Sequence, residues 1–298
     1  MRLLQTASVR AFSGMLLSVL AVATGAAQDT PDTAHFTFSR FSVPGAVDLG
    51  IESINNGGTI SGYFTDSAGD YKGFVRSSSG TVTTVVDPGA TSSPSITELG
   101  QIDTTGIAAG EFYDPATSVY SSFFYNSTKG TYRTYNVPGQ PANTDTSVNG
   151  INKDATHFCG AVESPPYSME NAFIGIAGKV DIFSVESSSE TVCTALNNSD
   201  SAVGFYVDSA GVVHGWLRSS SGDITTIDEP DASTVTGSAP CGGTAGGTTV
   251  VGINNDGTIS GHFWDSSFNE HGFYRTADGK YHEVNVPKAY HIRAVAGA

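Results

Sequence analysis

The sequence predicts an all-β protein, namely a five-bladed β-propeller built from four-stranded antiparallel blades. The first observation is internal repetition, because the segments Ser53–Ala90 and Gly252–Ala289 are similar in sequence along their whole length. The second is a glycine-centred motif that recurs at spacings of 48, 50, 44 and 57 residues, at Gly62, Gly110, Gly160, Gly204 and Gly261. The third is the lack of any helical periodicity. Repeats of this length without helices are typical of rings or stacks of small β units.

Each repeat opens with a short strand that ends at an Ile-Asn pair or a close variant, as at Ile54-Asn55. Asn bonds to nearby backbone and tolerates left-handed conformations, so the pair predicts a tight turn. The second strand follows, with the glycine at its centre, as in Ile60-Ser61-Gly62-Tyr63-Phe64. A glycine inside a strand marks the close approach of another backbone. We therefore expect each sheet to pack tightly on its neighbour there.

A second turn, such as Asp66–Asp70, leads into a third strand around Lys72-Gly73-Phe74. A third turn leads into a fourth strand that alternates and, in most repeats, ends near proline. Four strands in 45–50 residues match the size of a propeller blade. One such sheet cannot bury both faces alone, so the repeats must stack on one another. The repeat domain is predicted to span residues 35–290.

The N-terminal segment Phe36–Ala46 matches the fourth-strand type rather than the first. The chain thus has six fourth-type strands for five of every other type. Two arrangements are compatible with this count. The blades are shifted by one strand along the chain, or one terminal strand is redundant.

The repeat resembles the HAF repeats of extracellular proteins, whose name comes from a His-Ala-Phe triplet in the third strand. The triplet is matched by His214-Gly215-Trp216 and His271-Gly272-Phe273, and in part by Asn171-Ala172-Phe173. The INNxGxIxG and VPGA elements also agree, and the match extends over Phe36–Ala289. The resemblance implies an exported, propeller-like repeat protein, and it carries no catalytic residues.

Residues 1–27 have the composition of a secretory signal peptide. Arg2 and Arg10 precede an apolar run at Met15–Ala23, and small residues lead to a predicted cleavage after Ala27. The apolar run is too short for a membrane span, which needs about 20 residues. We therefore expect a secreted or periplasmic protein without a membrane span.

The net negative charge of the chain argues against a nucleic-acid partner. The chain has 14 Lys and Arg against 29 Asp and Glu, a net charge of −15. Such an acidic chain is repelled by phosphate backbones, so no nucleic-acid partner is expected. We expect a monomer that binds an unknown extracellular ligand, with carbohydrate as one candidate.

The three cysteines, Cys159, Cys193 and Cys241, cannot all pair within one chain. Cys159 and Cys193 are the disulfide candidate, and their bond would close a loop of about 35 residues. Cys241 could equally be a partner, and three free thiols are also compatible with the sequence.

No metal, nucleotide or nucleophile motif is present, so no cofactor or metal is expected. A catalytic residue in a repeat protein should break the repeat, and three acids do so: Glu52, Glu111 and Glu163. Some five-bladed propellers are glycosidases, and hydrolysis of a glycosidic bond needs a pair of carboxylates. The alternative hypothesis is therefore a glycoside hydrolase that uses these acids; ordinary surface acids are the simpler explanation.

Aromatic residues near the central glycines offer a binding hypothesis. Tyr63, Tyr113 and Trp264 could stack on sugar rings, although packing between blades also explains them. His262 stands where the other repeats have Tyr, Glu, Ala and Phe. The leading interpretation is a non-enzymatic binding or surface-interaction module with these four residues as ligand-binding candidates. A purely structural exported protein is a third interpretation.

Overall fold

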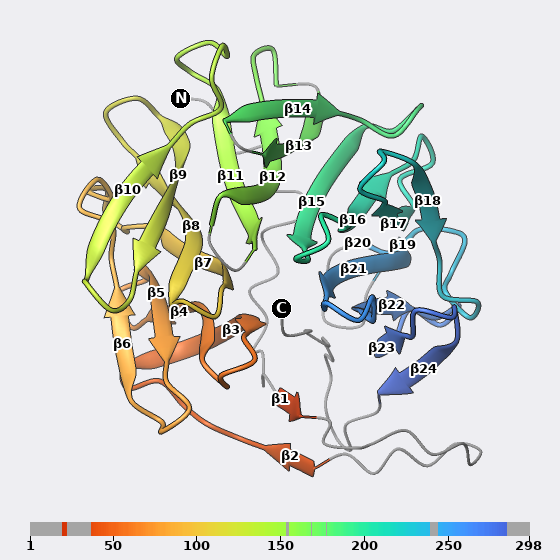
Figure 1. Ribbon diagram of the computed structural model, residues 1–298, viewed down its shortest axis with the longest axis horizontal. Helices are drawn as coiled ribbons and strands as arrows, with labels where there is room; N and C mark the ends of the chain where they lie inside the picture. The colour runs from red at the N-terminus through yellow and green to blue at the C-terminus, as the bar shows by residue number, and fades with distance from the viewer. Residues whose placement is uncertain are drawn as a thin grey trace.

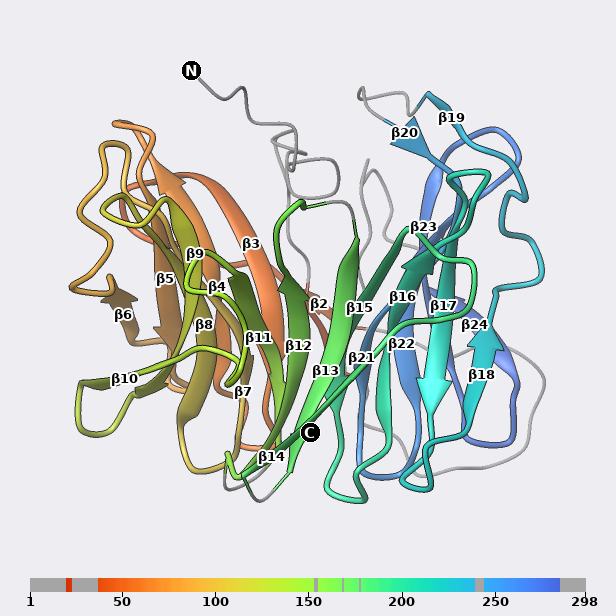
Figure 2. The same ribbon diagram turned by 90° about the horizontal axis from the view of Figure 1, so that it is seen from above.

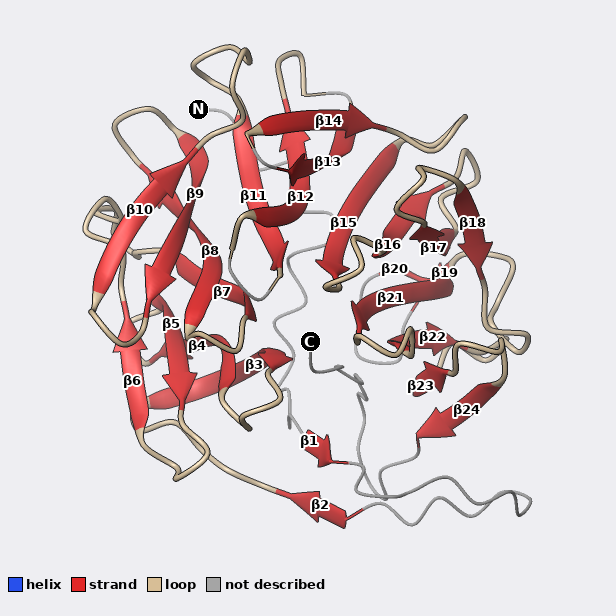
Figure 3. Cartoon of the chain, viewed as in Figure 1, coloured by secondary structure: helices blue, strands red, loops and turns tan. Residues whose placement is uncertain are grey.

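The computed structural model describes residues 20–22, 37–152, 155–167, 169–176, 178–238 and 244–284. Every regular element within these residues is a β-strand, and none is a helix (Figure 3). The prediction of an all-β chain is therefore confirmed. Cys241, nearly all of the predicted signal peptide and both edges of the predicted repeat domain lie outside the described residues.

Twenty of the described strands form five antiparallel groups of four, in which each strand pairs with the next along the chain. Group 1 is β3 (Ala46–Ile54), β4 (Ile60–Asp66), β5 (Tyr71–Arg76) and β6 (Val82–Val85). Group 2 is β7 (Thr97–Ile102), β8 (Ile107–Asp114), β9 (Val119–Asn126) and β10 (Thr131–Tyr135). Group 3 is β11 (Asp145–Ile151), β12 (His157–Glu163), β13 (Glu170–Ile176) and β14 (Lys179–Phe183).

Group 4 is β15 (Glu190–Leu196), β16 (Ala202–Val207), β17 (Val213–Arg218) and β18 (Ile224–Ile227). Group 5 is β21 (Gly247–Ile253), β22 (Ile259–Trp264), β23 (Glu270–Arg275) and β24 (Tyr281–Val284). Two short two-stranded sheets complete the described strands, β1 (Leu20–Val22) with β2 (Thr37–Ser39) and β19 (Gly237–Ser238) with β20 (Thr244–Ala245).

The five groups follow one another around a central axis in chain order (Figure 1). The first strands, from β3 to β21, lie nearest the axis, and the fourth strands, from β6 to β24, lie at the periphery. Seen at right angles to that view, the inner strands run along the axis (Figure 2). The arrangement is that of a β-propeller.

The hydrogen-bonded sheets do not separate as cleanly as the predicted blades. Groups 1 and 2 are separate four-stranded sheets, whereas groups 3, 4 and 5 belong to one sheet of twelve strands. Single parallel pairs make this connection, Glu170 with Glu190 and Val213 with Gly247. An isolated bridge between Tyr71 and Ile96 is the equivalent contact between groups 1 and 2. The two pairs join a third strand to the first strand of the following group, and the bridge joins β5 to the residue just before β7.

The Ile-Asn pairs end the first strands in tight turns, as predicted. The side-chain oxygen of Asn55 accepts hydrogen bonds from the backbone N–H groups of Gly57 and Thr59, at 2.9 and 3.0 Å. The carboxylate of Asp103 accepts the equivalent pair in group 2, from Thr105 and Ile107. A short polar side chain thus replaces backbone partners inside the turn.

The central glycines mark a close backbone approach, but the approaching backbone is not the one expected. A Cβ added to Gly160 would lie 1.7 Å from the carbonyl oxygen of Ser147, and one added to Gly204 would lie 1.9 Å from that of Val192. The corresponding partners elsewhere are the carbonyls of Gly50, Glu98 and Thr249, facing Gly62, Gly110 and Gly261. These carbonyls belong to the first strand of the same group, which carries a β-bulge beside the glycine in every group. The glycine therefore accommodates the bulge and does not contact a neighbouring sheet.

The hydrophobic core lies between the groups, as the repeat predicts. One cluster combines Val75 and Val85 of group 1 with Leu99, Phe112 and Phe123 of group 2. Further clusters join groups 2 and 3, groups 3 and 4, and groups 4 and 5. Each sheet is sheltered from water by the next one around the axis.

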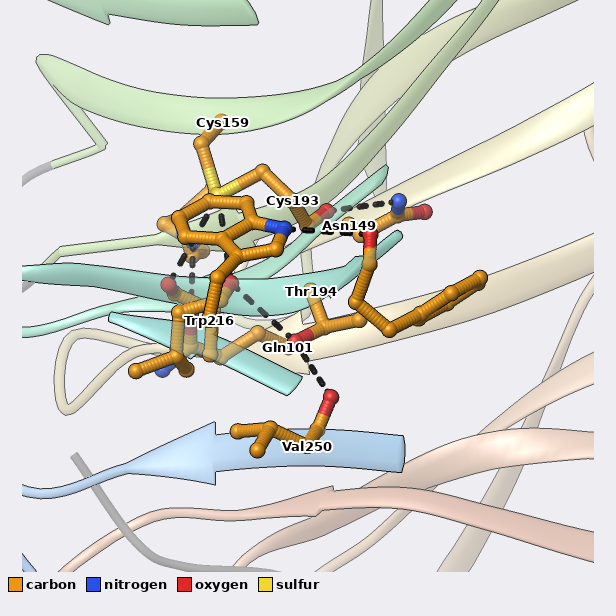
Figure 4. Close-up of a disulfide and its surroundings, with 11 residues drawn as sticks. Gln101, Asn149, Cys159, Cys193, Thr194, Trp216 and Val250 are labelled. Atoms are coloured by element: carbon orange, nitrogen blue, oxygen red, sulfur yellow. Dashed lines mark hydrogen bonds between the residues drawn. A yellow bond between two sulfur atoms is a disulfide. The ribbon is translucent and has the colours of Figure 1, made fainter. Parts of the chain in front are cut away.

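Groups 3 and 4 are also joined covalently, because Cys159 and Cys193 form a disulfide with their Cα atoms 5.7 Å apart (Figure 4). This confirms the predicted pair. Cys159 lies on β12 and Cys193 on β15, and the ring of Trp216 packs beside the bond. A Cβ at Gly150 would come within 3.0 Å of the Cys159 sulfur, so the bulge glycine leaves room for the bridge.

The strand pairing near the two ends of the chain shows whether the extra N-terminal strand completes group 5. Group 5 is completed by its own fourth strand, β24, which pairs with β23. The N-terminal strand β2 pairs instead with β1. Group 5 therefore does not use β2 as its fourth strand, and β2 is additional to the five groups; its partner β1 lies within the predicted signal peptide. In Figure 1 the strands β1 and β2 lie between group 5 and group 1.

Candidate functional site

The candidate site lies at the end of the groups where the second strand turns into the third. We call this the turn end, and it includes residues 63–71 of group 1 and their counterparts in the other groups. The four ligand-binding candidates from the sequence lie there, in the second strands β4, β8 and β22. They are Tyr63, Tyr113, His262 and Trp264.

Two tyrosine pairs occupy the turn end of groups 1 and 2. Tyr63 stacks on Tyr71 with ring centroids 6.2 Å apart, and Tyr113 lies 5.3 Å from Tyr120. All four rings are half-buried. The Tyr63 ring also fills the space that a side chain on Gly50 would take, because a Cβ there would lie 2.7 Å from the ring. Each pair thus holds its rings in a fixed orientation and leaves part of them in contact with solvent.

A row of carboxylates occupies the same end of groups 3 and 4. In register, Asp145 stands opposite Glu163, and Glu163 stands opposite Glu170. The parallel pair then places Glu170 beside Glu190 of the following group. Residues directly opposite in a sheet have Cα atoms about 4.5–5.5 Å apart, and like charges there repel. We call these four residues the acid row.

Glu111 lies between two groups. Its carboxylate accepts a short hydrogen bond from the hydroxyl of Ser147 on β11, and the residue is only 7% exposed. Glu98 stands directly opposite it on β7. Two carboxylates therefore face the same inter-group space on adjacent strands.

The three acids proposed for hydrolysis lie on three different groups. Glu52 lies in the bulge of β3, close to the Asn turn, whereas Glu163 ends β12 at the turn end. Glu111 lies in β8, two positions closer to the central glycine than the counterpart of Glu163, which is Tyr113. The acids that stand in register with Glu111 and Glu163 are other residues, and the hydrolytic role of the three stays a prediction.

His262 and Trp264 meet the same acid in group 5. The Nε2 atom of His262 lies 3.6 Å from the carboxylate of Glu270, and these two side chains are 8% and 4% exposed. Trp264 stands opposite Glu270 in register. His262 is thus nearly buried beside Glu270, and Trp264 is the half-buried residue at the edge.

The recurrent histidines of the third strand hold the neighbouring turn. His271 bonds the carboxylate of Asp265 at 3.1 Å and that of Glu283 at 2.5 Å. Burial acts to raise the pKa of Asp265, but hydrogen bonds from Asn269 and His271 outweigh it and lower the pKa to about 2. Burial acts to lower the pKa of His271, but its two carboxylate partners raise it overall. His214 contacts Asp208 and Asp228 in the same way.

Sequence reasoning missed part of this site. It did not single out Asp145, Glu170 or Glu190, because each is unremarkable until strand pairing places it opposite another acid. The available signal was the hairpin, since counting back from the turn puts Glu170 opposite Glu163. Among the described residues, no group of three or more His, Cys, Asp or Glu side chains is arranged to hold a metal ion. In the same part of the chain, no helix is long and apolar enough to cross a membrane.

No family model matches this chain, and no curated protein matches it. Solved structures do resemble it. TolB from Acinetobacter baumannii aligns over 76% of this chain and 52% of its own, with a TM-score of 0.55 and 10% identity. A putative TolB from Agrobacterium tumefaciens aligns over 83% of both chains, with a TM-score of 0.53 and 11% identity. The chain thus spans about half the length of the first of these proteins. Both are β-propellers, so the likeness supports that fold and nothing further.

Proposed function

We propose that this protein is an exported, non-enzymatic β-propeller with five four-stranded blades, groups 1 to 5, that binds an extracellular ligand at its turn end. The five blades are supported by the identical pairing order within each group and by the hydrophobic clusters that lie between successive groups. Loops and strand ends from several blades meet at one end of a propeller, where binding sites commonly form.

The main support for the proposal is that groups 1 and 2 each carry a pair of tyrosines in contact at the turn end. Tyr63 with Tyr71 and Tyr113 with Tyr120 present half-buried rings at equivalent ends of their sheets. The acid row continues this end into groups 3 and 4. Rings offer flat apolar surfaces, and carboxylates accept hydrogen bonds from hydroxyls. This combination suits a carbohydrate, which has both apolar ring faces and many hydroxyls.

Export is supported by two independent features. The N-terminal residues have the composition of a cleavable leader. The Cys159–Cys193 disulfide fits an oxidising compartment, because such bonds rarely persist in the cytosol. The resemblance to HAF repeats also implies an extracellular protein, and we retain it as part of this proposal.

A glycan array probed with the mature protein tests the proposed ligand class. We expect the double substitution Tyr63→Ala and Tyr113→Ala to reduce binding of the strongest glycan at least 10-fold in titration calorimetry. Tyr63→Phe with Tyr113→Phe is the matched control, because it keeps both rings and should retain most of the affinity. Absence of any bound glycan, or equal affinity of both variants, would count against the binding site.

A glycoside hydrolase is the second candidate, favoured by the register of Glu98 opposite Glu111. Retaining enzymes hold two carboxylates about 5 Å apart. A hydrolase screen of the mature protein, repeated with Glu111→Gln, tests this directly. Activity that is lost in the variant would replace the binding proposal by an enzymatic one, and no activity in either protein would remove this candidate.

A further inference from the structure

A carboxyl group is buried at the junction of groups 1 and 2. Asp87 follows β6 in the chain and is only 4% exposed. Its backbone N–H donates to the hydroxyl of Thr97 on β7 at 3.1 Å, and its Oδ1 atom accepts a hydrogen bond from the Gly89 N–H at 2.8 Å. The Oδ2 atom is buried without a hydrogen-bond partner. Such a site favours the neutral acid over the carboxylate, because water no longer stabilises the charge.

Other repeats place an apolar residue at the position of Asp87. The residue before the proline of the fourth-strand motif varies along the chain and is Val43, Asp87, Val137 or Glu229. Both valines are buried in hydrophobic clusters, which also contain Val82 and Val180 from the fourth strand of the following group. Asp87 therefore replaces an apolar residue at a position that packs against the next group.

The described groups that face Asp87 carry no positive charge. Tyr132 of β10 occupies the place that valine holds in the apolar pairs. Burial raises the pKa of Tyr132, and the charges of Tyr125 and Asp87 add to that rise. From β7 the contact is the uncharged hydroxyl of Thr97. Burial raises the pKa of Asp87, and the hydrogen bond from Gly89 offsets only part of the rise.

Glu229 shares this repeat position but has different surroundings. It is half-buried, and burial is the largest cause of its raised pKa. The charges of Asp231, Glu283 and His271 also act on it. Asp87 is thus the acid of the two that is enclosed without other charged side chains.

The segment 87–96 connects the two tyrosine pairs of groups 1 and 2. The Tyr71 N–H donates to the carbonyl of Ser95 at 2.8 Å, and the Tyr113 N–H donates to that of Ile96 at 3.2 Å. A parallel bridge also joins Tyr71 to Ile96. One segment therefore holds the backbone of a tyrosine from each pair, and Asp87 is its first residue.

The far end of the segment is held by a carboxylate with the opposite pH response. Asp70 accepts a hydrogen bond from the Ser95 N–H at 2.7 Å, and this bond lowers the pKa of Asp70. Lys72 and Asp66 are the charged groups that act on Asp70. Asp70 is therefore ionised above about pH 4.5, where its ordinary pKa alone would already favour the charged form. A pH change above this value leaves the bond from Ser95 intact.

We propose that Asp87 is a pH-sensitive anchor of the segment 87–96. With a proton on its carboxyl group, Asp87 packs as the valines do and holds the segment between groups 1 and 2. When the proton passes to solvent, the buried charge loosens the segment and the backbone hydrogen bonds from Tyr71 and Tyr113. This inference concerns the segment itself and does not depend on the ligand of the turn end.

Amide exchange followed by NMR tests the proposal, because the Tyr71 and Tyr113 amides donate directly to the segment. A raised pKa means that the closed segment binds the proton more tightly than the open one, so low pH favours closure. After correction for intrinsic exchange rates, we expect both amides to be about 3- to 10-fold better protected at about pH 4.5 than at about pH 7.5. The Ala46 amide, which donates to the carbonyl of Val43 at the equivalent turn, is the internal reference and should not respond.

Asp87→Asn removes the charge and keeps an acceptor for the Gly89 N–H. In this variant, protection of Tyr71 and Tyr113 should be the same at both pH values. At the higher pH it should exceed that of the unmodified protein by about 3-fold or more. Asp87→Val restores the residue of the other repeats and carries the same expectation if the asparagine variant does not fold. Asp223→Asn, in an exposed turn of group 4, is the matched control and should keep the unmodified response.

Three results would overturn the proposal. The first is equal protection of Tyr71 and Tyr113 at both pH values in the unmodified protein. The second is an Asp87→Asn or Asp87→Val protein that keeps the unmodified pH response. The third is an equal response of the Ala46 amide, which would assign the effect to the whole fold and not to this segment.

Discussion

Groups 3 and 4 are joined by a covalent bond at the position where groups 1 and 2 are joined by a hydrogen bond. Cys159 and Ser61 both precede the central glycine of a second strand, and both reach the first strand of the next group. The backbone at this position is the same in both groups. The comparison shows that the repeat fixes where neighbouring groups meet, whereas the individual side chain decides which kind of bond joins them.

The largest expected effect comes from removing the covalent contact. Replacing both Cys159 and Cys193 by serine should lower the free energy of unfolding by about 3–4 kcal/mol, because the bond closes a long loop in the unfolded chain. Urea denaturation followed by tryptophan fluorescence measures the change. Reduction of the unmodified protein should give a similar loss. A loss below about 1 kcal/mol would mean that packing alone holds this junction.

The central glycine beside the contact is the next most sensitive position. Gly204→Ala would place a Cβ 1.9 Å from the Val192 carbonyl and 2.7 Å from the Trp216 ring. The resulting shift of the bulge should cost about 2–3 kcal/mol. Gly57→Ala is the control in a turn, where the nearest atom would be 3.2 Å away. Equal midpoints for the two variants in thermal unfolding would contradict the role of the bulge.

Removing the hydrogen bond between groups 1 and 2 should lower the free energy of unfolding by less than these two changes. Ser61→Ala removes the bond to the Gly100 carbonyl and should cost about 1 kcal/mol, the usual contribution of one such bond. Ser79→Ala, at an exposed turn position, should leave the unfolding free energy unchanged. If Ser61→Ala matched the loss of the disulfide, the distinction between the two junctions would fail.

The smallest change in unfolding free energy is expected for His271, whose contacts with Asp265 and Glu283 lie within group 5. The pKa of His271 is raised in the folded protein, so its contacts stabilise the fold below the unfolded pKa of about 6.5. This contribution is lost as the pH rises through the folded pKa. His271→Gln should therefore cost about 0.5–1 kcal/mol at pH 5.5 and less at pH 9. An equal cost at both pH values would show that the histidine acts through packing and not through its charge.

Much of the fold could be predicted because local sequence patterns define the strands and turns of the repeat. The Ile-Asn turns and the alternating strands depend on residues within a few positions of one another. The pairing of Cys159 with Cys193 could be proposed only as one candidate among the three cysteines, because the bond joins residues 34 positions apart and no local signal selects it. The role of the central glycine was assigned to the wrong backbone, because a bulge in the first strand has no local signature.

The candidate site was less accessible from the sequence. Tyr63 and Tyr113 were identified by their place after the glycine, and the structure puts both at one end of adjacent groups. The acid row was not identified, because opposition of Glu170 and Glu190 depends on a contact between two groups. The near burial of His262 beside Glu270 likewise depends on strand pairing rather than on spacing.

The sequence by itself determined the repeat unit, which consists of four short strands, the turns between them and the apolar strand faces that must be buried. Local conformational preference and the alternation of apolar and polar residues set all of these. Only the tertiary structure decided how units meet, which acids face each other and which strand is left over at the N-terminus. The physical reason is that contacts between units join residues about 20 to 57 positions apart. Their geometry follows from packing and register, which no short stretch of chain encodes.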